Sequence, residues 1–235
     1  MKKTLIMISL CALFFGCTKD WGNPTTRNYP ISESFTELRA SDAFQVTVSD
    51  QVTDVVVTVD ELAQDRVVVK VVNGELHIGF KPNTWYNGTK PVAVIPATAN
   101  LRSVDLSGAS SFTGNLNGHD VDIDLSGASH FHGYVDADEV DVDLSGASKA
   151  IMNGFCQEKM DIDLSGASTL EASLLETPSV VGSLSGASTA DVTVCSNLNV
   201  SLSGASTLIY GLVSPDCNPY INCPCTGSST VRPRW

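Results

Sequence analysis

Seven aspartates recur at intervals of 19 or 20 residues, in two series that lie two positions apart: Asp105, Asp124, Asp143 and Asp163, and then Asp122, Asp141 and Asp161. Segments of this length that stack as β-strands place equivalent residues about 4.8 Å apart. Carboxylates at that spacing repel one another and attract cations. Because Ca²⁺ takes several carboxylate oxygens, we interpret these residues as a candidate face for Ca²⁺ or a cationic partner. The alternative is a solvated polar face with ordinary counterions.

A second candidate for binding is an aromatic pair, Trp85 and Tyr86, which follows a Lys-Pro-Asn-Thr segment. Aromatic rings with a polar edge suit surfaces that are part apolar and part wet, so this pair is the candidate glycan contact. The alternative is that the two rings pack against the rest of the domain.

The sequence predicts no catalytic site, because it has no phosphate-binding loop, nucleophile elbow or zinc-protease pattern. An acidic metal site in a β-helical lyase needs a nearby base. Here residues 103–165 hold 12 acidic side chains and two basic ones, Lys149 and Lys159. We therefore expect a protein that is not an enzyme and has no resident metal or cofactor, with Ca²⁺ as the one candidate ligand.

The pentapeptide Leu-Ser-Gly-Ala-Ser determines the predicted fold. It occurs six times, starting at Leu106, Leu125, Leu144, Leu164, Leu184 and Leu202. Apolar residues alternate with aspartates before several copies, as in Val140-Asp141-Val142-Asp143, which predicts strands with one buried face. Recurrent Gly and β-branched residues disfavour helical repeats. The sequence therefore predicts an all-β parallel β-helix with about 19–20 residues per coil.

The half before the repeats is β-rich but irregular, and we predict that it caps the solenoid. The Asn73-Gly74 pair suits the tight turn of a β-hairpin. Strands are predicted over residues 44–48, 55–59, 67–72, 75–80 and 92–95, with a short, polar, helical link over 61–66. A cap of this kind keeps open strand edges from pairing end to end.

The first residues have the pattern of an export signal. Lys2 and Lys3 precede an apolar run over residues 4–15, and Gly16-Cys17 follows at once. The pattern resembles a bacterial lipoprotein signal, in which Cys17 carries the lipid; an ordinary secretory signal is the alternative. We expect a signal peptide over 1–16, a tether over 17–30, one β-helical domain over 31–213 (an irregular part, 31–100, and coils, 101–213) and a Cys- and Pro-rich tail over 214–235.

Five cysteines follow the lipidation position: Cys156, Cys195, Cys217, Cys223 and Cys225. Export makes disulfides plausible. Cys156 and Cys195 lie two coils apart, about 9.6 Å, which exceeds the reach of about 7 Å for a disulfide. We expect the tail to fold back over the last coil and pair with Cys195, with the partner left open. A zinc site on Cys223 and Cys225 is the alternative.

The formal charge of −12 excludes one class of partner. Nucleic acids and anionic head groups need a basic face to neutralise their phosphates. We therefore predict that the protein does not bind nucleic acid.

The β-rich lead-in, the segment Asn73-Gly74-Glu75-Leu76-His77-Ile78 and the tandem pentapeptides resemble the GIN-domain family of Bacteroidetes lipoproteins, the head domain of autotransporter adhesins. The resemblance covers roughly residues 29–210. It implies a right-handed β-helix similar in shape to pectin lyases, without catalytic residues and with a role in adhesion.

Together these observations predict a non-catalytic adhesion module, anchored by lipid in the outer membrane and exposed at the cell surface. The expected partner is an extracellular glycan or a host matrix protein. The alternative is a carbohydrate-binding or carbohydrate-active β-helix. The sequence leaves the oligomeric state and the membrane leaflet open.

Overall fold

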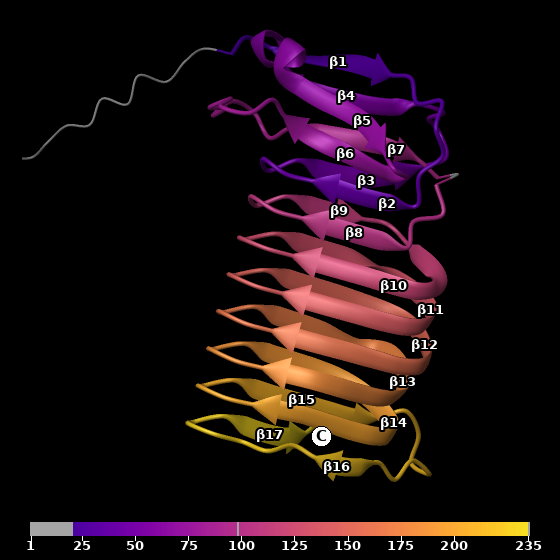
Figure 1. Ribbon diagram of the computed structural model, residues 1–235, viewed down its shortest axis with the longest axis vertical. Helices are drawn as coiled ribbons and strands as arrows, with labels where there is room; N and C mark the ends of the chain where they lie inside the picture. Colours follow the sequence, from indigo (N-terminus) through magenta and orange to yellow (C-terminus); the bar gives the residue numbers. More distant parts are fainter. Residues whose placement is uncertain (1–20, 98, 235) are drawn as a thin grey trace, which may run out of the picture.

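The computed structural model describes residues 21–97 and 99–234, and the predictions for the signal peptide and for Cys17 lie outside them. The described chain is almost entirely β-structure and forms a solenoid of about seven turns. Figure 1 shows the coils stacked along the long axis, with the first strands at one end and the last strands at the other. The predicted all-β parallel β-helix is confirmed.

Long strands that follow the coils build the solenoid. Each pairs in parallel with the next strand along the chain. Within β11, Val140, Val142 and Leu144 are buried, whereas Asp141 and Asp143 are exposed, so period-two alternation sets the inner and outer faces. The strands are β10 Leu116–Leu125, β11 His130–Leu144, β12 Lys149–Leu164, β13 Thr169–Leu184, β14 Thr189–Leu202 and β15 Thr207–Leu212.

The pentapeptide forms the tight turn between coils. Gly146 has a φ of 71°, and a Cβ at this position would press into the carbonyl oxygen of Gly127 in the coil before it. Ala147 N donates to that same oxygen at 2.7 Å. The hydroxyl of buried Ser148 donates to the carbonyl of Ser145 at 2.7 Å. The repeated residues therefore have a structural role, because the same turn recurs in every coil.

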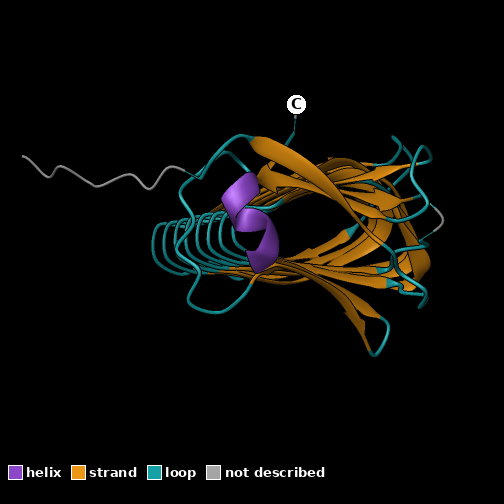
Figure 2. Ribbon diagram, turned by 90° about the horizontal axis from the view of Figure 1, so that it is seen from above, coloured by secondary structure: helices purple, strands orange, loops and turns teal. Residues whose placement is uncertain are grey.

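The irregular half forms the predicted strands and the predicted hairpin. The predicted helical link over residues 61–66 is a 3₁₀ helix. Its elements are β1 Pro24–Tyr29, β2 Glu37–Ala40, β3 Gln45–Ser49, β4 Val55–Asp60, η1 Glu61–Arg66, β5 Val67–Val72, β6 Glu75–Phe80, β7 Val92–Pro96, β8 Ser103–Leu106 and β9 Ser111–Thr113. β5 and β6 form the hairpin, and β4 pairs antiparallel with β1 and β7. Figure 2, which looks down the stack, shows η1 in front of the strands.

The order of coils in space differs from the order in the chain. β2 lies between β6 and β8, and β3 lies between β7 and β9, all in parallel pairs. Ala40 aligns with Leu106, the first pentapeptide leucine. Asp42 and Ala43 then adopt positive φ angles of 61° and 63°, so residues 40–44 repeat the turn although they keep only its Ser and its Ala, as Ser41 and Ala43.

Two predicted segment boundaries are wrong. The predicted tether includes Trp21, which is 6% exposed, and β1, which pairs with β4, so the folded cap begins at least as early as Trp21. The predicted tail forms another coil with β16 Tyr220–Asn222 and β17 Thr230–Pro233. Gly227 has a φ of 72° and stacks on Gly204, as the pentapeptide glycines do.

Candidate functional site: an acidic groove along the coils

The structure brings the seven predicted aspartates together on one outer face. The first series is in register across four strands, and the second across three, so each carboxylate lies one coil from the next. We call these residues the aspartate ladder: Asp105 on β8, Asp122 and Asp124 on β10, Asp141 and Asp143 on β11, and Asp161 and Asp163 on β12. Parallel in-register stacking produces the ladder, because it superimposes identical residues.

An open groove of about 450 Å³ runs beside the ladder, parallel to the solenoid axis. The first-series aspartates form one wall, and the first serines of the pentapeptides form the other. Its lining includes Asp105, Asp124, Asp143, Asp163 and Ser183 on one side, and Ser126, Ser145, Ser165 and Ser185 on the other. The groove thus offers the same pair of groups, a carboxylate and a hydroxyl, at each successive coil.

The middle of the ladder is held in an electrostatically unfavourable state. Burial raises the pKa of Asp124, and the charges of Asp143 and Asp105 raise it further. The pKa of Asp143 is raised by burial and then by the charge of Asp163. Burial and the charge of Asp161 raise the pKa of Asp141, although Lys159 acts in the opposite direction. These carboxylates therefore favour a proton or a cation more than ordinary surface aspartates do.

Polar partners reach both ends of the ladder. At one end, Arg39 Nε contacts Asp105 Oδ2 at 2.8 Å. At the other, Ser183 Oγ donates to Asp163 Oδ1 at 2.5 Å. Among the described residues, no ion pair is formed by Asp124 or Asp143. The unpaired negative charge is therefore concentrated in the central coils.

Arg39 also belongs to this site, although no pattern in the sequence predicts it. A second hollow, of about 520 Å³, shares Asp105 with the groove and is also lined by Arg39, Lys70, His77 and Phe80. Arg39 lies 66 residues before Asp105, and the two meet only because β2 is inserted beside β8. No local motif signals that pairing. This hollow therefore places two cationic side chains, Arg39 and Lys70, beside the cap end of the acidic groove, and Arg39 is paired there with Glu75 and Asp105.

Calcium binding by the ladder stays a prediction. Within residues 21–97 and 99–234, no group of three or more His, Cys, Asp or Glu side chains is arranged to hold a metal ion. Lys159 lies beside the second series, 3.3 Å from Glu139 and 3.9 Å from Asp161. A diffuse layer of counterions remains the alternative.

The two residues of the predicted aromatic pair differ in their exposure to solvent. Trp85 is 87% exposed. Tyr86 instead packs inside the cap, with its ring 5.1 Å from that of Trp21 and 4.8 Å from that of Phe80. Its hydroxyl donates to Asp60 Oδ2 at 2.9 Å. Tyr86 is only partly exposed because its ring and hydroxyl also serve the cap, so Trp85 is the more accessible of the two residues. Glycan contact by this pair stays a prediction.

Buried Asp60 organises this part of the cap. Its carboxylate accepts hydrogen bonds from Thr89 N at 2.9 Å, Thr89 Oγ1 at 2.6 Å and Tyr86 OH. Burial alone would raise the pKa of Asp60, but these three donors bring the net pKa below its ordinary value. The charged form of Asp60 thus connects β4 to the loop over residues 81–91.

Comparison with known proteins identifies the family. A family model described as "Putative auto-transporter adhesin, head GIN domain" matches residues 34–211. The chain belongs to this family. Among solved structures, a "putative adhesin" of Bacteroides fragilis NCTC 9343 has a TM-score of 0.79 and 17% identity, and the match covers 90% of this chain and 97% of the other. A "putative adhesin" of Parabacteroides distasonis ATCC 8503 has a TM-score of 0.66 and 20% identity, with coverage of 91% and 98%.

A third similar structure carries a different description. It is a "Putative lipid binding protein" of Parabacteroides distasonis ATCC 8503, with a TM-score of 0.62, 20% identity, and coverage of 91% of this chain and 98% of the other. At these identities the likeness shows a shared fold. No curated protein matches the chain.

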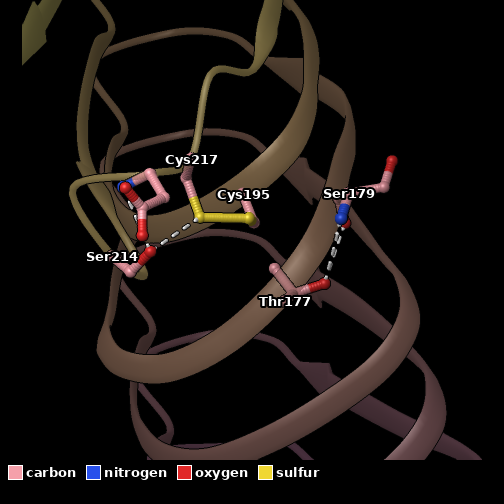
Figure 3. Close-up of a disulfide and its surroundings, with 6 residues drawn as sticks. Thr177, Ser179, Cys195, Ser214 and Cys217 are labelled. Atoms are coloured by element: carbon pink, nitrogen blue, oxygen red, sulfur yellow. Dashed lines mark hydrogen bonds between the residues drawn. A yellow bond between two sulfur atoms is a disulfide. The ribbon is translucent and has the colours of Figure 1, made fainter.

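The GIN-domain match ends at residue 211, between the two cysteines of a disulfide that closes the last coils. Cys195 on β14 is bonded to Cys217, as Figure 3 shows, so the prediction that the C-terminal segment pairs with Cys195 is confirmed. Cys156 is a buried free thiol whose pKa is raised by burial. Cys223 and Cys225 are also free. Zinc binding by these two thiols stays a prediction.

Proposed function

We propose that this GIN-domain protein is a lipid-anchored, non-catalytic adhesion module at the cell surface, and that a cationic, extended partner lies in its acidic groove. The observation that carries the proposal is the groove itself. It offers the same carboxylate and hydroxyl at each coil. An extended ligand can use several such contacts at once, whereas a single reaction centre does not need them.

The dimensions and charge of the groove favour a polypeptide. From Asp105 to Asp163 the ladder spans three coil steps, about 14 Å, which is the length of about four residues of an extended peptide. Lysine or arginine side chains would place cations near Asp124 and Asp143. Charge complementarity of this kind contributes to specificity and to the rate of association.

The predicted export signal and the disulfide support the cellular location. Lipid on Cys17 would anchor the chain in the outer membrane, and disulfides persist mainly in exported proteins. None of the described helices is long and apolar enough to cross a membrane. The anchor therefore rests on the sequence pattern around Cys17.

Binding measurements with two matched variants test the adhesion proposal. The first, Asp124→Asn with Asp143→Asn, removes two charges from the groove; the second, Asp136→Asn with Asp216→Asn, removes two exposed charges elsewhere. We expect decalysine and any matrix protein that binds the wild type to lose about tenfold in affinity for the first variant only, which corresponds to about 1.4 kcal/mol. Equal losses for both variants would show that the groove has no specific role.

The carbohydrate alternative depends mainly on Trp85, the more exposed of its two predicted contacts. It predicts binding on a glycan array that Trp85→Ala abolishes and that the two groove substitutions leave intact. That result would favour a carbohydrate-binding module over a module that binds cationic protein segments.

A further inference from the structure

The folded domain begins close to the predicted lipid. Trp21 is 6% exposed, and its Nε1 donates to Asn87 Oδ1 at 2.7 Å. Its carbonyl oxygen accepts a hydrogen bond from Leu62 N at 3.0 Å, and its ring lies against Tyr86. Trp21 is thus fixed to both η1 and the loop over residues 81–91.

The short distance from Cys17 to Trp21 in the chain limits how the domain can sit on a membrane. Four residue steps separate them, which span at most about 14 Å even when fully extended. By contrast, eight coil steps separate β6 in the cap from Cys225 in the last coil, about 38 Å. A lipid on Cys17 therefore holds the cap near the bilayer.

The cap exposes apolar side chains next to this attachment point. Leu62 on η1 is 59% exposed, and Trp85 in the loop is 87% exposed. Both belong to segments that form hydrogen bonds with Trp21, namely η1 and the loop over residues 81–91. Lys81 and Lys90, at the ends of the same loop, are also exposed, and Lys81 Nζ donates to the carbonyl oxygen of Asp65 at 2.7 Å. η1 adds two exposed carboxylates, Glu61 and Asp65. Tryptophan concentrates at membrane interfaces, and lysine can reach head-group phosphates from there.

We propose that η1 and the loop over residues 81–91 form a membrane-docking face, with Leu62 and Trp85 entering the interfacial layer of the bilayer to which Cys17 is anchored. The inference rests on the proposed lipid anchor. Charge favours the same orientation. The first ladder residue, Asp105, lies two coil steps from β6, about 10 Å. Anionic head groups therefore repel the coils more than the cap, and the solenoid stands away from the membrane.

This orientation connects the anchor to the acidic groove. The groove runs parallel to the solenoid axis, with Asp105, which pairs with Arg39, at the end nearer the cap, and with the unpaired Asp124 and Asp143 farther out. Docking of the cap presents the central aspartates away from the lipid surface. A partner can then reach them without displacing the protein from the membrane.

Fluorescence quenching by brominated lipids tests the docking face. The lipidated full chain is reconstituted in phosphatidylethanolamine–phosphatidylglycerol vesicles, and the Trp85 signal is the difference between the wild type and Trp85→Phe. The matched control adds Leu174→Trp to Trp85→Phe, because Leu174 lies on β13, far from the cap, and is 75% exposed. We expect at least threefold stronger quenching at position 85 than at position 174.

Three outcomes would overturn the inference in distinguishable ways. Equal quenching at positions 85 and 174, with lipid found on Cys17 by mass spectrometry, would refute the docking face and leave the anchor intact. An N-terminal peptide without lipid would refute both the anchor and the docking face. Glycan binding that depends on Trp85, together with weak quenching, would assign the side chain to sugar recognition instead.

Discussion

Removing one central charge of the aspartate ladder should stabilise the protein. Asp143 faces Asp124 in the coil before it and Asp163 in the coil after it. At the coil spacing of about 4.8 Å, each pair of charges repels by about 0.9 kcal/mol in water. Asp143→Asn removes both repulsions. Because Asp143 is exposed to solvent, we reduce their sum and expect the free energy of unfolding to rise by about 1 kcal/mol at pH 7.

The pH dependence has a definite sign. Burial and the charge of Asp163 raise the pKa of Asp143 in the folded protein. A raised pKa means that stability is fully present below the ordinary aspartate pKa and is lost as the pH rises through the folded value. The wild type and Asp143→Asn should therefore have equal stability near pH 3 and diverge toward pH 7.

Urea and thermal denaturation at both pH values check this prediction. A gain of about 1 kcal/mol corresponds to a melting temperature about 2–4 °C higher for a chain of this size. The gain should shrink in 1 M salt, where the Debye length is about 3 Å. Asp105→Asn is the control, since it removes the partner of Arg39 and should give no gain. No stabilisation by Asp143→Asn at pH 7, or a gain that salt leaves unchanged, would refute the reasoning.

Three further predictions concern the turn, the disulfide and the cap. Gly146→Ala should lower the free energy of unfolding in urea by about 3 kcal/mol, because the new Cβ meets the backbone of the preceding coil. The control is Gly74→Ala, which also has a positive φ but no atom within 4 Å of the new Cβ, and it should cost about 1 kcal/mol. Equal costs would rule out the clash. Loss of the disulfide in Cys195→Ser, which opens a loop with a sequence separation of 22, should cost about 3 kcal/mol and expose the last coil to proteolysis first; an unchanged cleavage pattern would contradict this. Asp60→Ala should cost about 3 kcal/mol at pH 7, because three donors lose their acceptor. Since the pKa of Asp60 is lowered, this contribution is present above the ordinary aspartate pKa and disappears as the pH falls through the folded value, so an equal cost at pH 3 and pH 7 in urea denaturation would count against it.

Most of the fold could be predicted because its signals are local and repeated. Alternation around Asp141 and Asp143 gave the strands and their outward face, and Asn73-Gly74 gave the hairpin. The aspartate ladder could be predicted from stacking alone, because coils in register place equivalent residues of each repeat above one another.

The failures come from segments whose structure depends on distant partners. β1 has little alternation, and it is a strand because β4 offers it an edge. In the last coil, only Gly227 and Ser229 keep the pentapeptide pattern, yet the coil before them imposes the same turn. Tyr86 is less exposed than Trp85 for a similar reason, because its hydroxyl donates to the buried carboxylate of Asp60.

The coil formed by β2 and β3 makes the two ends of the solenoid unequal in their resistance to unfolding. In a simple solenoid each coil contacts only its neighbours in the chain, so the ends can fray independently. Here β2 and β3 lie between strands that come later in the sequence, so the first coil and the cap share one set of hydrogen bonds. The cap can separate from the coils only if β2 unpairs from β6 or from β8. Arg39 then loses its ion pair with Glu75 or with Asp105. The C-terminal coil has no such interleaving and depends on the Cys195–Cys217 bond and on the contacts of Arg234 with β14 instead. Unfolding should therefore begin at the last coil and reach the cap last, which leaves the end nearest Cys17 as the more durable one.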